Sequence, residues 1–270
     1  MYRIREGLGL WEGRGKVAAV GIGHSPTTRR WDEKPETSLG AWSILALRNA
    51  MKDAGVSPDK VDGLVMCPGG LGEDWKPRPI PEDFARAYQL TDNPDDGLSR
   101  ISADFVLKNM PELKNVKFTM YGPGCMSNAI CVAAQAVATG QTHTCLVLTA
   151  RGNLEGRYHQ AGPNAGGTIS GDAQWSNPWG ATGPYYPAHW FNRYAQKYGK
   201  NHDMMAPFVV NEKRNGLLFP EGFFAQNRPE PLTVEDYLGA RWICQPLNLF
   251  DCDMPIQVAV AYLFTTPQRA

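Results

Sequence analysis

Short apolar runs alternate with helical patterns over the first 150 residues. The apolar runs predict strands at 16–23 (KVAAVGIG), 61–67 (VDGLVMC), 115–121 (NVKFTMY) and 143–150 (HTCLVLTA). Helical spacing of apolar residues predicts helices at 37–54, 99–109 and about 125–139. Strands that alternate with helices in this way are typical of a layered α/β fold with right-handed crossovers.

The pattern changes after residue 150. Gly, Asn, Pro, Trp and Tyr crowd together, and helical spacing returns only at 190–198, 204–216 and 233–239. Such a stretch inside a compact domain often forms a lid or a binding wall. We therefore predict three segments: residues 1–150 as the main α/β part, 151–245 as a loop-rich inserted subdomain, and 246–270 as a return to the main part through a closing strand near Val258 to Thr265 (VAVAYLFT).

Composition and charge exclude several function classes. Lys plus Arg equals Asp plus Glu at 27 each, so the chain lacks the positive surface that binds nucleic acid. The six cysteines form no CxxC pair, which argues against a metal site. No window approaches the roughly 18–20 apolar residues of a membrane span, and the charged N-terminus is unlike a secretory signal. We expect a cytoplasmic protein with reduced thiols.

One cysteine lies where a helix begins. The segment YGPGCMSNAICVAAQAVATG places Cys125 directly after Gly-Pro-Gly, which does not fit inside a helix. Unpaired N–H groups and the positive end of the helix dipole would lower the pKa of this thiol from about 8.5. Cys125 is therefore a candidate nucleophile; the alternative is a small buried apolar residue, an interpretation that suits Cys67, Cys131 and Cys145.

The helix that follows Cys125 has apolar residues on every face. Between Met126 and Thr139 it contains no charge, and a helix of this kind is buried on all sides. A single layer of helices on a sheet leaves each helix half exposed. Another domain or another chain is thus expected to cover it.

These segments resemble the thiolase superfamily, whose reactive cysteine begins a buried central helix with the signature Cys-x-Ser-Gly. This chain has Cys125-Met126-Ser127-Asn128 and departs from the signature at Asn128. GRYHQAG, AQWSNPWG, NEKRNG, PLTVEDYLGAR and PLNLFDCDMPIQVAVAYLFTT resemble the sterol-carrier-protein-like, or lipid-transfer, thiolase branch, which includes steroid side-chain aldolases. The resemblance covers the family's N-terminal half, a mixed sheet with a buried central helix, plus its loop domain.

The resemblance implies an enzyme that makes or breaks a carbon–carbon bond in an acyl-coenzyme A thioester. In thiolase chemistry Cys125 forms an acyl-enzyme and passes the acyl group to coenzyme A. The oxyanion is expected near Gly124, Met126, Ser127 and Asn128 at the helix start, and the acid/base residues are expected outside this chain. The family forms dimers through the strand that corresponds to 115–121.

Two alternatives stay open. The first is retro-aldol cleavage of a steroid-type β-hydroxyacyl-CoA together with a small zinc-ribbon/OB-fold partner protein, where the cysteine need not be the nucleophile. The second is a lipid-binding or scaffold subunit without catalysis. The Asn128 departure and the aromatic insert favour the first of these, while the retained cysteine favours the thiolase.

The insert contains further candidates, each with a structural interpretation. His159 and His189 are possible acid/base groups, although lone histidines more often have structural roles. The aromatic residues form either a wall for substrate or coenzyme A or, as we favour slightly, the subdomain's own core: Trp175, Trp179, Tyr185, Tyr186 and Trp190. Phosphates of coenzyme A would suit Arg or Lys, which by default are solvated: Arg151, Arg157, Arg193, Lys213 and Arg214.

Two local motifs carry less chemistry. The carboxylates of Asp251 and Asp253 are expected to fix a turn, with Cys252 between them as a weak candidate for a second reactive thiol. The Gly21-Ile22-Gly23 turn lacks the third glycine and the acidic residue of a dinucleotide-binding fingerprint.

Overall fold

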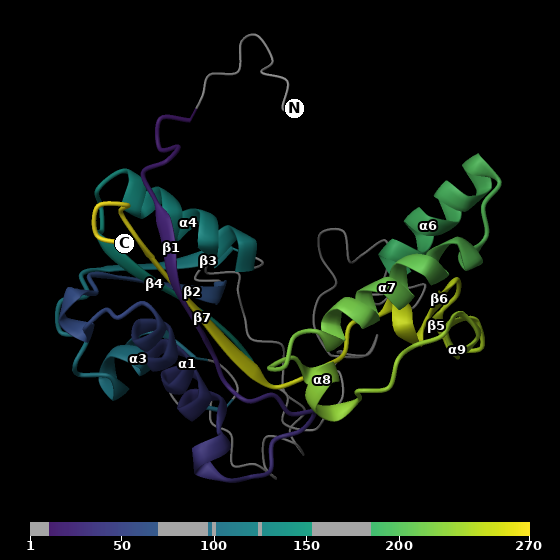
Figure 1. The fold of residues 1–270 in the computed structure, drawn as a ribbon, viewed down its shortest axis with the longest axis horizontal. Coiled ribbons are helices and arrows are strands. Elements are labelled where there is room, and N and C mark those ends of the chain that lie inside the picture. Colours follow the sequence, from purple (N-terminus) through teal and green to yellow (C-terminus); the bar gives the residue numbers. More distant parts are fainter. Residues whose placement is uncertain (1–10, 70–96, 99–100, 124–125, 153–184) are drawn as a thin grey trace, which may run out of the picture. The chain divides into compact units, whose positions relative to one another are not determined.

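The computed structural model describes residues 11–69, 97–98, 101–123, 126–152 and 185–270 (Figure 1). The chain divides into two compact units. Unit 1 comprises Met1–Pro77, Pro81–Gly156 and Ile256–Ala270, and unit 2 comprises Arg78–Ile80 and Arg157–Pro255. We describe each unit separately.

Unit 1 contains a five-stranded mixed sheet. Its strands are β1 (Ala18–His24), β2 (Gly63–Gly69), β3 (Phe118–Pro123), β4 (Thr144–Arg151) and β7 (Val258–Thr265). The order across the sheet is β1-β7-β4-β2-β3. β2 is parallel to β3 and β4, whereas β7 is antiparallel to both β1 and β4. The five strands expected from apolar runs are all present, each shifted by a few residues at most, and the mixed α/β architecture is confirmed.

Helices cover both faces of this sheet. α1 (Leu39–Asp53) and α3 (Ala103–Asn109) pack on one face, and α4 (Met126–Ala138) packs on the other. Ser38 caps α1, since its side chain accepts a hydrogen bond from the N–H of Ala41 at 3.2 Å. Ser102 caps α3 in the same way, so α3 begins at Ala103 rather than at residue 99. Short 3₁₀ turns at Pro35–Thr37 and Pro58–Lys60 precede α1 and β2.

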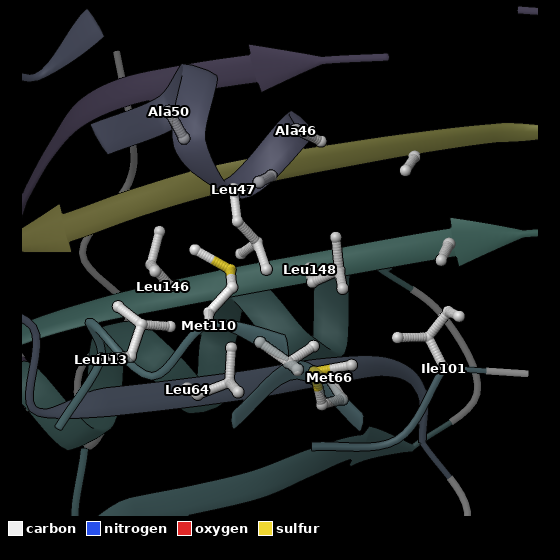
Figure 2. Packing of buried hydrophobic residues seen from close by; sticks show 14 of the residues in the cluster. Ala46, Leu47, Ala50, Leu64, Met66, Ile101, Met110, Leu113, Leu146 and Leu148 are labelled. Atoms are coloured by element: carbon white, nitrogen blue, oxygen red, sulfur yellow. The ribbon is translucent and has the colours of Figure 1, made fainter. Parts of the chain in front are cut away.

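The core beneath α1 and α3 is built from alternate residues of the central strands. Figure 2 shows Leu47 of α1 above the side chains of the sheet, with Met110 beside it. Leu64 of β2 and Leu146 of β4 lie opposite each other in register and are fully buried. This continuous burial explains the unbroken apolar pattern of β4, a strand buried on both faces.

Two glycines of β1 allow α1 to approach closely. A Cβ atom at Gly23 would lie 2.0 Å from the carbonyl oxygen of Ala46, and one at Gly21 would lie 2.3 Å from that of Ala50. Residues with side chains do not fit at such distances. The Gly21-Ile22-Gly23 sequence thus serves helix–strand packing, in agreement with our rejection of a dinucleotide fingerprint.

α4 packs against the opposite face through one side only. Ala129, Ala133 and Val137 are buried against Val65 and other residues of the sheet. Four residues on the outer side of α4 are exposed in this chain: Ser127, Asn128, Cys131 and Gln135. The sheet thus covers one side of α4, and the further layer that we expect another domain or another chain to supply stays a prediction.

The described residues of unit 2, 185–255, form short helices and a two-stranded hairpin. Its elements are α6 (Tyr185–Tyr198), a 3₁₀ turn His202–Met205, α7 (Ala206–Leu217), α8 (Phe223–Asn227), α9 (Val234–Leu238), β5 (Trp242–Cys244), β6 (Leu247–Asn248) and a 3₁₀ turn Leu249–Asp251. A small core of Ala206, Val209, Leu232 and Tyr237 joins α7 to α9. Helices were expected at three of these places, whereas α8 and the β5–β6 hairpin were not predicted from the sequence.

Candidate active site

The candidate site lies where β3 leads into α4. β3 ends at Pro123 and α4 begins at Met126, so the expected strand and helix lie on either side of Cys125 in the sequence. Gly124 and Cys125 themselves lie outside the described residues, and the role of Cys125 stays a prediction. Met126 packs partly buried against the core beneath α4, while Ser127 and Asn128 are exposed on the first turn.

Two further buried side chains lie near the carboxyl ends of the parallel strands, at the end of the sheet where β3 leads into α4. The carboxyl ends of β2, β3 and β4 share one edge, because these strands are parallel. Cys67 of β2 and Thr149 of β4 are paired in register near that edge and are both buried. They lie on the face of the sheet that α4 covers, since neighbouring positions with the same alternation, Val65 and Val147, contact α4.

The described thiols differ in burial and in the direction of their pKa shifts. Burial, assisted by the nearby Asp62 carboxylate, raises the pKa of Cys145 to about 12. Burial and the adjacent carboxylates also raise the pKa of Cys252, which makes it a poor second nucleophile. Cys67 and Cys145 are buried as expected, but Cys131 is exposed, because it lies on the side of α4 that faces away from the sheet.

The site candidates of the insert are placed only in part. His159, Trp175 and Trp179 lie outside the described residues. His189 is exposed on α6, with its ring 4.3 Å from that of Tyr185. Arg214 is exposed on α7 and donates a hydrogen bond of 2.7 Å to Oδ1 of Asn211. Both side chains belong to unit 2.

The aromatic residues of α6 do not form the core of the subdomain. Tyr186 and Trp190 are 43% and 74% exposed, and of the whole helix only Ala188 is buried. The expectation that these rings pack inside unit 2 is therefore wrong for Tyr186 and Trp190, which lie on the exposed side of α6, whereas Tyr185 is half-buried.

Lys213 is half-buried and contacts its neighbours. Its Nζ donates a 2.6 Å hydrogen bond to the carbonyl oxygen of Arg228 and lies 4.0 Å from the centre of the Phe224 ring. Desolvation by burial lowers the pKa of this amine. Lys213 thus joins α7 to α8 instead of reaching a phosphate group, whereas Arg193 is exposed and donates to Gln196.

A buried polar cluster in unit 2 was missed by sequence reasoning. Tyr237 donates a 2.6 Å hydrogen bond to Oδ1 of Asp251, and Nε2 of His202 lies 2.6 Å from Oδ2 of the same carboxylate. Asp251 also accepts from the backbone N–H of Asn248, which confirms that it fixes the turn. Of these contacts, only the one with Asn248 could be expected from the local sequence, as a cap formed by an Asn and an Asp three residues apart. The contact with His202 could not, because this residue lies 49 residues from Asp251.

Neither a metal site nor a membrane helix is evident in the described residues. Among them, no group of three or more His, Cys, Asp or Glu side chains could hold a metal ion. None of the described helices combines the length and the apolarity needed to cross a bilayer.

Comparison with solved structures defines the class of fold. The structure of the Ltp2–ChsH2(DUF35) aldolase matches 94% of this chain and 56% of that chain, with a TM-score of 0.70 and 24% identity. A monomeric SCP2-thiolase-like protein of Mycobacterium smegmatis matches with a TM-score of 0.57, 12% identity and coverage of 95% and 47%. Human mitochondrial 3-ketoacyl-CoA thiolase matches with a TM-score of 0.55, 13% identity and coverage of 94% and 65%. The chain has a thiolase-like fold.

Two sequence relatives of the chain are an aldolase and a CoA lyase. A steroid side-chain-cleaving aldolase of Thermomonospora curvata is 28% identical over 261 residues, which is 95% of this chain and 58% of the relative. The 17-hydroxy-3-oxo-4-pregnene-20-carboxyl-CoA lyase of Mycobacterium tuberculosis is 27% identical over 262 residues, with 95% and 59% covered. No family model matches the chain. The resemblance to the lipid-transfer thiolase branch with its steroid aldolases is confirmed, and the chain spans about three-fifths of the length of these relatives.

Proposed function

We propose that this chain forms part of an aldolase that cleaves a carbon–carbon bond in a steroid-type β-hydroxyacyl-CoA thioester. The observation that carries the proposal is the similarity along 95% of the chain to an aldolase and a CoA lyase, both of which are named for cleavage of steroid-derived substrates. The departure at Asn128 from the thiolase signature agrees with it. The sequence alone favoured thiolysis over retro-aldol cleavage, and the two relatives reverse this order.

The proposed reaction consumes no coenzyme A. A base removes the proton of the β-hydroxyl group, the oxygen forms a carbonyl, and the bond between the α and β carbons breaks. Its electron pair moves to the α carbon and gives a thioester enolate, which takes up a proton to yield a shorter acyl-CoA. The products are thus a ketone or aldehyde and an acyl-CoA. The base is expected outside this chain.

α4 would stabilise the negative charge of that enolate. The N-terminal end of a 13-residue helix carries a partial positive charge, and its first turn contains Met126, Ser127 and Asn128. Cys125 precedes this turn directly in the sequence, outside the described residues. In the aldolase its thiol has no covalent role, and the group is expected to fill space beside the substrate.

Thiolysis through Cys125 is the second candidate function. It is favoured by the start of α4 at Met126, which places a helix N-terminus directly after the cysteine in the sequence. In this reaction the thiolate attacks a β-keto carbon, and the bond between the α and β carbons breaks to leave the acyl-enzyme. The shorter acyl-CoA leaves as an enolate that takes up a proton, and the thiol of a second coenzyme A then takes the acyl group and restores the cysteine. Coenzyme A is therefore consumed.

The active assembly is proposed to contain further protein. A DUF35-type partner would correspond to the zinc-ribbon/OB-fold protein expected from the sequence, and the similarity of this chain to the Ltp2–ChsH2(DUF35) aldolase supports it. A homodimer would form through β3, which is an edge strand of the described sheet and carries an exposed Met120. The acid/base residues would come from the remaining part of a longer chain or from a partner.

The test compares two substrates with one assembly. The full parent chain, produced with its DUF35-type partner, is incubated with a steroid β-hydroxyacyl-CoA and with the corresponding β-ketoacyl-CoA. We expect a ketone or aldehyde from the first substrate without any coenzyme A, and Cys125→Ala should retain most of this activity. Turnover of the β-keto thioester only, dependent on coenzyme A and abolished in Cys125→Ala, would establish the thiolase instead. Binding of both thioesters without turnover would favour a scaffold.

A further inference from the structure

Four aromatic side chains follow one line along α6. Tyr186, Trp190, Tyr194 and Tyr198 are spaced at intervals of four residues and therefore lie on one side of the helix. Their exposed fractions are 43%, 74%, 44% and 54%. We call these four residues the aromatic row. It extends over about 18 Å at 1.5 Å per residue and exposes apolar surface on the order of 400 Å².

Basic side chains accompany the row, and acidic ones are missing from the helix. His189, Arg193 and Lys197 are also spaced at intervals of four residues, one position before Trp190, Tyr194 and Tyr198. The sequence of α6, YYPAHWFNRYAQKY, contains neither Asp nor Glu. One side of α6 thus offers aromatic rings with positive charge beside them.

Contacts within the helix hold parts of this surface in place. The rings of Tyr194 and Tyr198 lie 4.8 Å apart, and Nζ of Lys197 lies 5.2 Å from the centre of the Tyr198 ring. Arg193 donates a 3.2 Å hydrogen bond to the side chain of Gln196. Side chains that are ordered before binding lose less conformational entropy when a partner docks.

The composition of this surface is that of a protein interface. Tyr, Trp and Arg are the residues most enriched at binding hot spots. A helix that lies on a membrane also uses Trp, but together with Phe and Leu, and the aromatic row contains neither of these two. We propose that the aromatic row of α6 docks a partner protein whose apolar contact surface is surrounded by Asp and Glu. The proposal extends the proposed function, which includes a DUF35-type partner, by assigning the surface that the partner occupies.

A second copy of this chain fits the row less well. In a symmetric dimer through α6 the row would face itself, so that Arg193 and Lys197 of both copies would approach one another without any acidic residue of α6 to pair with. Like charges placed opposite each other disfavour such an interface. An acidic partner supplies the missing charge.

The area of the row is consistent with the centre of an interface. A standard interface buries about 800 Å² on each partner, of which the fully buried centre is a fraction. A row of about 400 Å² would provide that centre, with the basic side chains at its rim. Truncation of a central aromatic residue should therefore weaken the affinity for the partner strongly. A change of charge at the rim should mainly alter the rate of association.

The experiment measures binding of the purified DUF35-type partner to the full parent chain by biolayer interferometry. We expect Trp190→Ala and Tyr194→Ala each to raise Kd at least 10-fold, while the matched control Asn192→Ala, on another side of α6, leaves Kd within 2-fold. The double variant Arg193→Glu, Lys197→Glu should lower the association rate several-fold and remove most of its dependence on NaCl. Circular dichroism checks that each variant is folded.

Three results would overturn the proposal. They are unchanged partner binding in all α6 variants, tighter binding after charge reversal, and α6-dependent binding to phosphatidylserine vesicles with partner binding unaffected. The outcome is separable from that of the proposed function. If the assembly cleaves the aldol substrate but the α6 variants bind the partner with unchanged affinity, only the docking surface is refuted. If the partner binds through α6 but no aldol cleavage occurs, only the aldolase is refuted.

Discussion

The hydroxyl group of Tyr237 donates a 2.6 Å hydrogen bond to Oδ1 of Asp251, although the tyrosine is completely buried and the carboxylate is nearly so. His202 completes the arrangement, with its ring stacked on that of Tyr237 at 5.0 Å. Three separate segments, the turn before α7, helix α9 and the turn after β6, are thereby joined through one carboxylate. The Leu249–Asp251 turn is thus tied by hydrogen bonds to Tyr237, a residue of the small core of unit 2.

Removal of the tyrosine hydroxyl should destabilise unit 2. Tyr237→Phe leaves the aromatic packing intact but deprives the buried Asp251 of a donor, at an expected cost of about 1–3 kcal/mol. Urea unfolding of the purified chain measures the free energy of unfolding of each variant. Tyr198→Phe, which changes an exposed tyrosine, is the matched control and should have no measurable effect. Equal stability of the two variants would show that the buried bond contributes nothing.

The same tyrosine predicts a loss of stability in alkali. Burial, followed by the hydrogen bond to Asp251 and its charge, raises the pKa of Tyr237 above the ordinary value of 10.0. A raised pKa means that the protonated form is favoured in the folded state. Its contribution is complete below the unfolded pKa of about 10 and decreases as the pH rises above it. Unfolding at pH 9–11 should show this decrease in the wild type and a smaller one in Tyr237→Phe.

Asp62 predicts the opposite pH dependence in unit 1. Burial raises its pKa, but hydrogen bonds from Thr142, Thr144 and His143 outweigh this and hold the pKa below 3.8. A lowered pKa stabilises the folded state above the unfolded pKa, and this contribution is lost as the pH falls through the folded pKa. Asp62→Asn should cost about 1–2 kcal/mol at pH 7 and reduce acid sensitivity below pH 4, whereas Glu36→Gln, at an exposed position, should leave stability at pH 7 unchanged.

Two glycine-to-alanine substitutions should change the stability of the protein in opposite directions. Gly23→Ala would place a Cβ atom 2.0 Å from the Ala46 carbonyl oxygen, so α1 must move away from β1 at a cost of about 2 kcal/mol or more. Gly216 lies within α7, and a Cβ atom there would meet no described atom within 4 Å beyond the backbone of its own helix. Alanine at this position should stabilise unit 2 by about 0.5–1 kcal/mol. Midpoints of thermal unfolding measure both, and a stabilising Gly23→Ala would contradict the close packing.

Thiol labelling should separate the cysteines by exposure and ionisation. Cys145 is buried with a pKa of about 12, so iodoacetamide should not modify it in the folded chain near neutral pH. Cys131 is exposed and should react at an ordinary rate. In a Cys131→Ser background, Cys125 is predicted to react faster than the remaining thiols if the helix terminus lowers its pKa. Mass spectrometry of tryptic peptides identifies each site; labelling of Cys145 before Cys131 would contradict the described burial.

The sequence was most informative where the local pattern and the tertiary contacts agree. β4 and α1 follow directly from an apolar run and from a capped helical period, since both are packed over their length. Short elements carried no such signal: β6 has two residues, and α8 has five. Their formation depends on neighbours that single-sequence periodicity does not reveal.

The candidate site was less accessible to sequence reasoning. The strand before Cys125 and the helix after it could be predicted, because glycines and an alanine-rich run mark them locally. The exposure of the aromatic residues could not be predicted, because hydrophobic character alone does not distinguish a core residue from an exposed one. Trp190, which is 74% exposed, is the clearest case. Contacts such as that of His202 with Asp251 depend on the packing of distant segments.

The position of β7 between β1 and β4 has a consequence for biosynthesis. A ribosome completes β1, β2, β3 and β4 before it reaches Val258, so the facing edges of β1 and β4 have no partner strand while all of Arg157–Pro255 is translated. Open edges of this kind can pair with other chains, and late closure across a segment on the order of 100 residues slows folding. Nascent chains that end before β7 should therefore depend on chaperones to remain unaggregated.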